Sequence, residues 1–465
     1  MNNLLLFTLQ ATFYIYGAMG LVLSLKCLIY DDSSHNVFFI SSALSFIIGY
    51  FLHFMLQNTF KLRYFLKIIF FSWILLILVS SIPFLSLIQE LNLSSILFIS
   101  TSLITTSGFT LNFPTYFQKY EALFIWSSII QLMGGFFSII SFILIFHIFL
   151  NTQNKLIVFN KKIIIKFIIY YFLLYTVFFL ILNFSLNDIL NSFVMASAII
   201  STGGLIGNNG NILGFYFSNN IFLIIYSFLL TISALILPLF LYLQNKKILK
   251  NYYIKIFKRS FFLIIILSFL FLFFTSNNFL NIFENIFLFI SFITTSGILP
   301  NKLNNELILQ QINPFFFIFL LIIIIGSFSG SSSGGLKLDK VSILFIKIKD
   351  ELNKLAFRHK VFGVDLIKKG SDQKELNNLY ALIAFGILIV ICSILSLCIA
   401  GYSVFEAYTV SIAALTNTGE GFLYINNVIL NENSNIFLIL NFLMICGRFE
   451  IIGYLLIFQK IILKN

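Results

Sequence analysis

The chain has 465 residues, of which 59% are hydrophobic and 10% charged, and its mean hydropathy is +1.01. This composition excludes an ordinary soluble domain and predicts a polytopic membrane protein in the lipid bilayer. The net charge of +12 does not indicate a nucleic-acid partner, because most of the basic residues gather in a few segments that the positive-inside rule assigns to one side of a membrane.

Ten apolar runs are long enough to cross the hydrocarbon core of a bilayer, which takes roughly 20 helical residues. They lie near residues 4–30, 36–57, 64–89, 120–150, 163–184, 220–243, 260–276, 313–357, 378–400 and 433–462. The first run lacks a basic leading segment and a small-residue cleavage site, so we expect a retained helix and not a signal peptide.

The basic residues predict the orientation of these spans. Of the 29 Lys and Arg residues, 25 lie within 61–67, 155–166, 246–259, 337–374 and 460–464. The positive-inside rule assigns these segments to the cytoplasm. Ten spans then leave both termini cytoplasmic.

Four shorter apolar pieces lie between a span that leads outward and the span that returns. They cover residues 94–104, 188–199, 281–293 and 404–415, and they are too short to cross a bilayer. We therefore expect half-helices that enter from the outer face. Ser94, Asp188, Asn281 and Ser403 are the expected N-caps, because their side chains can accept hydrogen bonds from free backbone N–H groups.

A hydroxyl- and glycine-rich segment follows each half-helix, and the glycines at 108, 203, 297 and 419 are separated by 95, 94 and 122 residues. One such segment alone would more often be a turn or a helix contact. Four in matching topology predict a pore, because carbonyls and hydroxyls can replace the hydration shell of a cation. The candidate ion ligands are Thr106, Ser107, Gly108, Ser201, Thr202, Gly203, Thr295, Ser296, Gly297, Asn417, Thr418 and Gly419.

The predicted fold is all-α, with four helix–pore-helix–helix repeats around one pseudo-fourfold pore and an additional N-terminal pair of transmembrane helices. The expected units are the helix pair 1–60 and the pore repeats 61–155, 156–250, 251–360 and 361–465.

A Gly/Ser-rich run at 326–335 interrupts the second long helix of the third repeat. It lies on the cytoplasmic side of the expected filter, and we predict that it gates the pore. Its glycines are Gly326, Gly330, Gly334 and Gly335. The alternative is a polar kink or a cytoplasmic linker.

Arg448 lies deep in the last apolar run. A charge at such depth usually faces the bundle interior and marks an ion path, so we expect an electrostatic barrier beside the gate. Glu450 is two residues away and lies on a different helix face. The alternative is an ion pair with a carboxylate from another helix.

Cys27, Cys392, Cys398 and Cys446 have no paired spacing, and the four histidines are scattered. They indicate neither a disulfide framework nor a metal site. The sequence predicts a protein that is not an enzyme and has no organic cofactor.

These motifs resemble the TrkH/KtrB family of potassium uptake proteins, in a superfamily that also includes fungal Trk and plant HKT transporters. The resemblance covers nearly the whole chain, and the additional N-terminal helix pair makes it TrkH-like. It is carried by the four segments, Gln131–Gly135, the Gly/Ser run followed by Leu336 and Lys337, Asn417–Gly421 and Gly447–Glu450.

The resemblance implies four repeats around one K+ pathway, a homodimer in a bacterial inner membrane and a cytoplasmic nucleotide-binding regulatory subunit of the TrkA/KtrA type. It assigns the filter to the four segments and the gate to 326–335 with Arg448. In this superfamily a serine at the first filter glycine accompanies Na+ transport, so Gly108 favours K+.

The sequence therefore predicts the K+-translocating subunit of a Trk/Ktr-type uptake system. One alternative is a sodium-permeable or Na+/H+-coupled member of the same superfamily. Another is a secondary transporter of a small organic solute, for which inverted halves would be expected. A membrane transferase would need clustered carboxylates, histidines or a metal motif, and the sequence has none.

Overall fold

The computed structural model of the chain describes residues 2–30, 32, 34–55, 62–109, 120–150, 161–204, 219–243, 261–269, 271–272, 281–300, 316–356, 372–425, 428, 430 and 433–448. Within these residues the regular secondary structure is entirely helical. The expected boundaries between repeats, at 60, 155, 250 and 360, fall outside the described residues, so the domain limits stay predictions.

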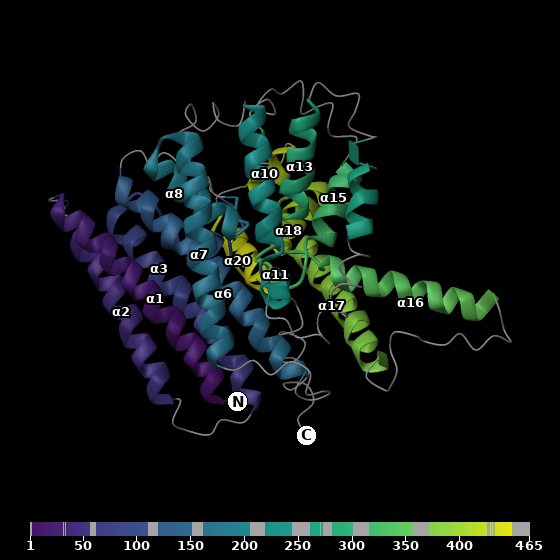
Figure 1. Cartoon of the computed structure of the whole chain (residues 1–465), viewed down its shortest axis with the longest axis horizontal. Coiled ribbons are helices and arrows are strands. Elements are labelled where there is room, and N and C mark those ends of the chain that lie inside the picture. The colour runs from purple at the N-terminus through teal and green to yellow at the C-terminus, as the bar shows by residue number, and fades with distance from the viewer. Residues whose placement is uncertain are drawn as a thin grey trace.

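The helices are α1 (Asn2–Ile29), α2 (His35–Met55), α3 (Leu62–Leu87), α4 (Leu93–Ile104), α6 (Glu121–Leu150), α7 (Lys161–Leu186), α8 (Ile189–Ile200), α10 (Asn220–Ala234), α11 (Ile236–Leu243), α13 (Ile282–Ile293), α15 (Phe316–Ile325), α16 (Leu338–Ala356), α17 (Asp372–Ile399), α18 (Val404–Leu415), α19 (Glu420–Ile425) and α20 (Ser434–Arg448). Most of the long helices lie side by side in one bundle (Figure 1).

Five helices of the described part are long and apolar enough to cross a membrane, namely α1, α2, α3, α6 and α7. Two of the other expected spans are helical but interrupted. The run at 220–243 is divided into α10 and α11 at Leu235, and the run at 313–357 stops at Ile325. The runs at 260–276 and 433–462 are only partly described.

The helix α6 is the most enclosed of these spans, and α7 is among the most exposed. In α6, 94% of the apolar window is buried, against 28% in α7. A helix that is apolar on all sides lies either in a protein core or against lipid. The two helices illustrate these two environments, and α6 is thereby positioned to contact the functional segments.

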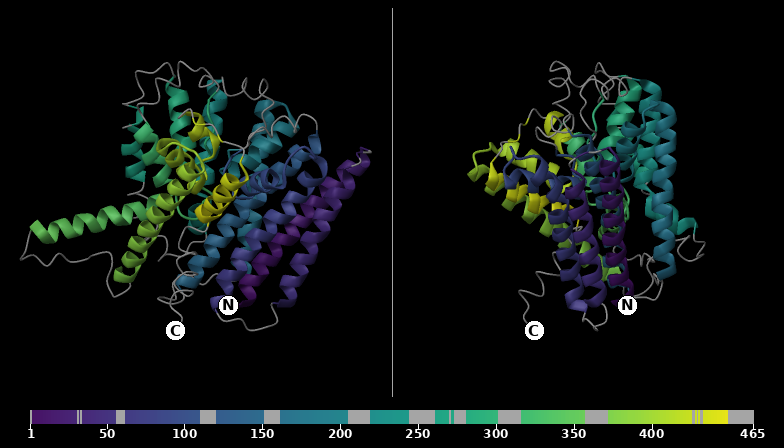
Figure 2. Two further views of the ribbon diagram at one scale, coloured as in Figure 1. Left: turned by 180° about the vertical axis from the view of Figure 1, so that it is seen from behind. Right: turned by 90° about the vertical axis from the view of Figure 1, so that its left-hand side faces the viewer.

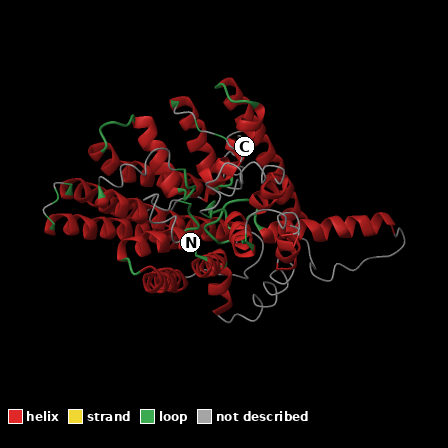
Figure 3. Cartoon of the chain, turned by 90° about the horizontal axis from the view of Figure 1, so that it is seen from above, coloured by secondary structure: helices red, strands yellow, loops and turns green. Residues whose placement is uncertain are grey.

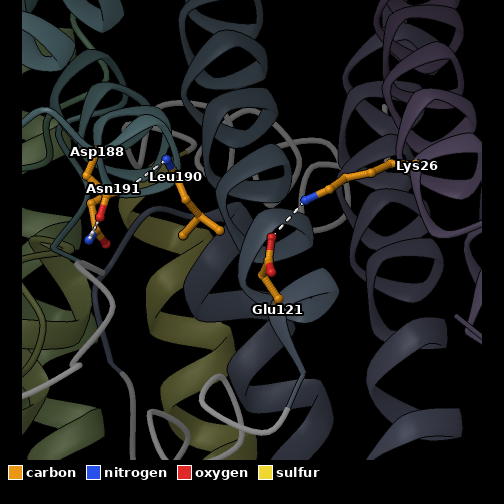
Figure 4. A network of polar contacts seen from close by, with 5 residues as sticks. All are labelled: Lys26, Glu121, Asp188, Leu190 and Asn191. Carbon is orange, nitrogen blue, oxygen red and sulfur yellow. Dashed lines mark hydrogen bonds and ion pairs between the residues drawn. The ribbon is translucent and has the colours of Figure 1, made fainter. Parts of the chain in front are cut away.

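Trp126 of α6 joins the N-terminal helix pair to the rest of the bundle. Its ring centroid lies 5.3 Å from that of Tyr16 in α1 and 5.6 Å from that of Phe38 in α2. Its indole N–H donates to the carbonyl of Ser80 in α3 at 3.1 Å. An ion pair between Lys26 and Glu121, 2.8 Å long, adds a surface contact between α1 and α6 (Figure 4).

The helix α16 was expected to continue a membrane span, and this prediction is wrong. It leaves the bundle sideways and projects from it (Figures 1 and 2). Its side chains Phe345, Ile348, Leu352 and Leu355 are exposed and follow helical spacing, which gives an apolar stripe. The Gly/Ser run before it permits this change of direction.

In Figure 3, which shows the bundle from above, some loops of the described part lie at its edge and others gather near its centre. Four half-helices, α4, α8, α13 and α18, end among them. These central loops contain most of the residues that the sequence selects as functional.

Candidate functional site

The four half-helices are confirmed, and each has 12 residues. Three of the four predicted N-caps are confirmed as the residues before the helix, namely Asp188, Asn281 and Ser403. The fourth is wrong, because α4 begins at Leu93 and its cap is Asn92, which makes no side-chain capping bond. Ser94 is therefore the second residue of that helix.

Side chains stabilise three of these helix starts. The Asp188 carboxylate accepts from the backbone N–H groups of Leu190 at 3.0 Å and Asn191 at 3.2 Å (Figure 4). The carboxylates of Glu284 and Glu406 accept from the N–H groups of Asn281 and Ser403, at 2.8 and 2.9 Å. Such contacts satisfy the donors that a helix leaves free at its N-terminus.

Each half-helix ends in the same backbone turn. The C-caps are Thr105, Ser201, Thr294 and Thr416. The next residue of each segment is left-handed, with φ of 52° at Thr106, 48° at Thr202, 55° at Thr295 and 54° at Asn417. Glycine usually occupies this position of a helix end. A β-branched residue there is a strained exception, of the kind that concentrates at functional sites.

This common turn corrects the alignment of the second segment by one residue. The N–H groups of Ser107, Gly203, Ser296 and Thr418 all bond to the carbonyl five residues earlier, at 2.8 to 3.0 Å. Gly203 therefore corresponds to Ser107, and Gly204 corresponds to Gly108. The sequence aligns Gly203 with the other glycines because both Ser201–Gly203 and Thr106–Gly108 combine hydroxyls with a final glycine, and only the helix end distinguishes them.

The four segments form a closed ring, because each of the aligned glycines, Gly108, Gly204, Gly297 and Gly419, lies against the next segment. A Cβ on Gly204 would lie 2.4 Å from the Ser296 carbonyl oxygen, and one on Gly297 would lie 2.0 Å from that of Thr418. The other two contacts complete the ring: a Cβ on Gly419 would lie 2.1 Å from the Ser107 oxygen, and one on Gly108 2.8 Å from Gly204 Cα. Each glycine thus allows the next segment to approach.

Side-chain hydrogen bonds also join neighbouring segments. The Thr106 hydroxyl donates to the Ser201 carbonyl at 3.2 Å, and the Ser107 hydroxyl donates to the Asn417 side chain at 2.5 Å. The polar side chains of the four segments are buried. The ring therefore encloses carbonyls and hydroxyls in a space that lipid does not reach.

The Gly/Ser run folds against three of the four segments. The Ser332 hydroxyl donates to the Ile200 carbonyl at 3.2 Å, and the Gly334 N–H donates to the Thr295 hydroxyl at 2.8 Å. A Cβ on Gly334 would lie 1.8 Å from the Thr416 oxygen. The run is thus a folded internal loop and not a cytoplasmic linker.

Backbone bonds and positive φ angles give this loop its compact form. Leu336 and Lys337 donate their N–H groups to the carbonyls of Ile324 and Ile325, at 2.8 and 2.9 Å. The loop thereby returns to the end of α15 and satisfies carbonyls that a helix end leaves free. Gly326, Gly330 and Gly335 have φ of 66°, 83° and 80°, which glycine adopts without steric cost.

Lys337 holds the loop from inside. Its side chain is buried, and its ammonium donates to the Ser333 carbonyl and to the Ser331 carbonyl, the latter at 3.4 Å. The hydroxyls of Ser331 and Ser333 also bond to each other at 2.7 Å. A buried charge needs such partners, so the folded loop and the lysine stabilise each other.

Arg448 contacts the remaining segment. Its Nε donates to the Thr105 carbonyl, and its Nη2 donates to the carbonyl and the hydroxyl of Thr106. Within the described residues Arg448 forms no ion pair with a carboxylate, so the alternative of a structural ion pair is not supported. Glu450 lies outside the described residues. The loop and Arg448 together contact all four segments.

Arg448 occupies a position where two other repeats have glycine. A Cβ on Gly135 of α6 would lie 2.6 Å from Ser201 Cβ, and one on Gly334 would lie against the backbone of Thr416. Gly135, Gly334 and Arg448 thus each contact the C-cap of the half-helix in the next repeat around the ring. These C-caps are Ser201, Thr416 and Thr105, respectively. The preceding residue, Gly447, lies against Leu415 as Gly134 lies against Ile104. The fourth repeat thus has an arginine in place of the second glycine.

Metal-binding clusters of His, Cys, Asp and Glu are absent from the described residues, and the four cysteines are free.

Sequence reasoning missed two contributors to the site, namely Gly204 and the clamp formed by Lys337. The signals for them were a second glycine after Gly203 and a lysine directly after the Gly/Ser run.

Comparison with known proteins identifies similar chains. Residues 307–464 match a family model described as TrkH, cation transport protein. The Trk system potassium uptake protein TrkH of Escherichia coli (strain K12) is 29% identical over 136 residues, which are 29% of this chain and 28% of that protein. The protein of the same name in Salmonella typhimurium matches equally. The matched stretch thus spans little more than a quarter of these relatives' length.

A solved structure matches over a much longer stretch. The potassium transporter TrkH from Vibrio parahaemolyticus has a TM-score of 0.82 with this chain and covers 98% of it, while this chain covers 97% of that one. The two sequences are 19% identical. The likeness shows the same all-helical membrane fold over nearly the whole chain.

Proposed function

We propose that the chain belongs to the TrkH cation transport family and is the K+-translocating subunit of a Trk-type uptake system, since residues 307–464 match the TrkH model and the fold over nearly the whole chain resembles that of a solved TrkH. The observation that carries this proposal is the closed ring of four segments, in which each aligned glycine faces the next segment's backbone. A continuous ring of carbonyls is the element that replaces the hydration shell of K+.

Three features of the ring suit a permeating cation. The four half-helices end at it, so their negative C-terminal ends favour positive charge there. The ring contains carbonyls and hydroxyls, and neither group has to lose a proton to bind an ion. The segments differ in sequence, since the equivalent residues are Ser107, Gly203, Ser296 and Thr418. The filter is therefore pseudo-fourfold. A transporter of this kind catalyses no chemical step.

The driving force requires no hydrolysis by this chain. A membrane potential of about 100 mV contributes ~2.3 kcal/mol per positive charge that moves inward. The alternative functions are a sodium-permeable or an Na+/H+-coupled carrier of the same family. A glycine at position 108 favours K+, as the superfamily resemblance implies. The site is also tight, because a Cβ built on Gly108 would lie 2.8 Å from Gly204 Cα.

Control of the pore is assigned to the loop at 326–335 and to Arg448. The loop's contacts with the second, third and fourth segments and the arginine's contacts with the first support this assignment. Together they obstruct the exit below the filter. Opening requires that both withdraw, with Gly326, Gly330 and Gly335 as the flexible points.

Replacing Lys337 with methionine is expected to raise K+ flux about fivefold to tenfold. The change leaves the Ser331 and Ser333 carbonyls without their ammonium donor, and unpaired buried carbonyls weaken the closed loop. Flux is measured in proteoliposomes. Lys340→Met, three residues further along at a partly exposed position, is the control and leaves flux unchanged. A Lys337→Met protein with normal flux but lower thermal stability would show that Lys337 stabilises the loop and would contradict the gating role of the loop.

The partners follow from the family and from α16. We propose a homodimer in a bacterial inner membrane, with both termini cytoplasmic, and a cytoplasmic nucleotide-binding regulatory subunit that docks on the basic segment 337–374. The exposed stripe of Phe345, Ile348, Leu352 and Leu355 supports contact of α16 with another chain, because projecting apolar stripes usually mark interaction surfaces.

Growth and flux together test the proposed function. An uptake-deficient bacterium that expresses this chain with its regulatory subunit is expected to grow at low K+. Purified protein in liposomes should then move K+ faster than Na+ along an imposed gradient. Failure of both assays would refute the proposal, while K+ movement that depends on an opposing Na+ or H+ gradient would favour the coupled alternative. Uptake of an organic solute without K+ movement would favour a secondary transporter of a small organic solute.

A further inference from the structure

The second segment of the ring lacks a hydroxyl pair that the other three have. In those three, the hydroxyl of the C-cap lies close to the hydroxyl two residues later. The pairs are Thr105 with Ser107 at 2.8 Å, Thr294 with Ser296 at 3.4 Å and Thr416 with Thr418 at 2.6 Å. The second segment has Gly203 at the later position, so the Ser201 hydroxyl bonds only back into α8.

The amide of Gln131 occupies the place of the missing hydroxyl. Gln131 lies on α6, one turn before Gly135, which packs against Ser201. A Cβ built on Gly203 would lie 1.9 Å from Gln131 Nε2 and 2.8 Å from its Cδ. The amide therefore fills the volume into which a side chain at 203 would extend, and a side chain at both positions does not fit.

Neither polar atom of Gln131 has a partner among the described residues, although the side chain is only 1% exposed. An amide buried in this way is costly unless a bond is made to something else. A water or a partly hydrated cation inside the ring has the chemistry to bond to it, since the amide both donates and accepts. A hydroxyl has the same two capacities.

We propose that Gln131 is a positioning residue of the second filter segment, whose amide replaces the absent hydroxyl and keeps Gly203 and Gly204 in register with the other three segments. This inference rests on the proposed function, because it assigns a role within the same filter. It explains why the second segment tolerates two successive glycines, which alone would leave its backbone under-determined.

A reciprocal exchange tests the proposal. Gln131→Ala is expected to lower the ratio of K+ to Na+ flux about tenfold, since one hydrogen-bonding group is lost. Gly203→Ser is expected to lower it similarly, because the new side chain displaces the amide. The double variant Gln131→Ala with Gly203→Ser regains the hydroxyl and the space for it, so the ratio returns to within about twofold of the wild type. Ser127→Ala, whose hydroxyl bonds only within α6, is the control.

The outcomes are distinct. A double variant no better than the worse single variant, or a Gln131→Ala protein with unchanged selectivity, would overturn the inference. Melting temperatures in detergent give a second readout without transport, and recovery of the value lost in Gly203→Ser by adding Gln131→Ala supports the positioning role. If the wild type moves no K+ but this recovery occurs, the proposed function fails and the packing role of Gln131 stands.

Discussion

Replacing Arg448 with alanine is expected to raise K+ flux at least about tenfold. The guanidinium lies against the Thr105 and Thr106 carbonyls at the base of the ring, where a positive charge would repel a cation in the proposed pore. At about 4 Å and an effective dielectric constant near 20, two unit charges interact by about 4 kcal/mol. Flux into proteoliposomes, without the regulatory subunit, measures the effect.

The variant Arg448→Lys separates charge from geometry. It keeps the charge but lacks the planar fork by which the Nε and Nη2 of the guanidinium reach Thr105 and Thr106 separately. We expect an intermediate flux. An Arg448→Ala protein with wild-type flux would show that the arginine only braces the first segment, and a melting temperature lowered without any change in flux would be its signature.

Replacing Gly297 with alanine is expected to abolish selective K+ transport. The added Cβ would lie 2.0 Å from the Thr418 oxygen, and the residue has φ of 63°. The third or the fourth segment would then have to move, because the two atoms nearest to the added Cβ, the carbonyl oxygen and carbon of Thr418, belong to the backbone. K+-selective flux and K+-dependent thermal stabilisation are both expected to disappear.

Gly401 provides the matched control for this substitution. It also has a positive φ, 103°, but nothing lies within 4 Å of a Cβ built there. Gly401→Ala therefore adds backbone strain of roughly 1–2 kcal/mol without a clash, and selectivity should remain. If Gly297→Ala and Gly401→Ala lowered selective flux equally, backbone strain and not the closed ring would account for the loss.

The sequence was most informative where local chemistry repeats. The half-helices were predictable because short apolar pieces such as 281–293 start at capping residues and end at hydroxyls. The register of the second segment was not, because Ser201–Gly203 imitates the other segments and only the left-handed Thr202 fixes the alignment with Gly204.

Long-range contacts account for the other differences. The depth of Arg448 predicted an interior charge, but its partners are backbone carbonyls 342 and 343 residues away, and no sequence pattern records such acceptors. The direction of α16 depends on where the Gly/Ser loop returns to α15. The apolar positions of α16 fit a span and an exposed stripe equally well.

The presence of Arg448 at a position where two other repeats have glycine has a consequence for how a pore of the proposed kind can evolve. A channel assembled from four identical subunits cannot alter one quarter of its axis, because every substitution appears four times. Four guanidinium groups at the level where Gly135 and Gly334 pack would repel one another and leave no room for the loop. Placing the four quarters in one gene removes that constraint, so a single charge and a single loop can each be acquired independently and adjusted one at a time.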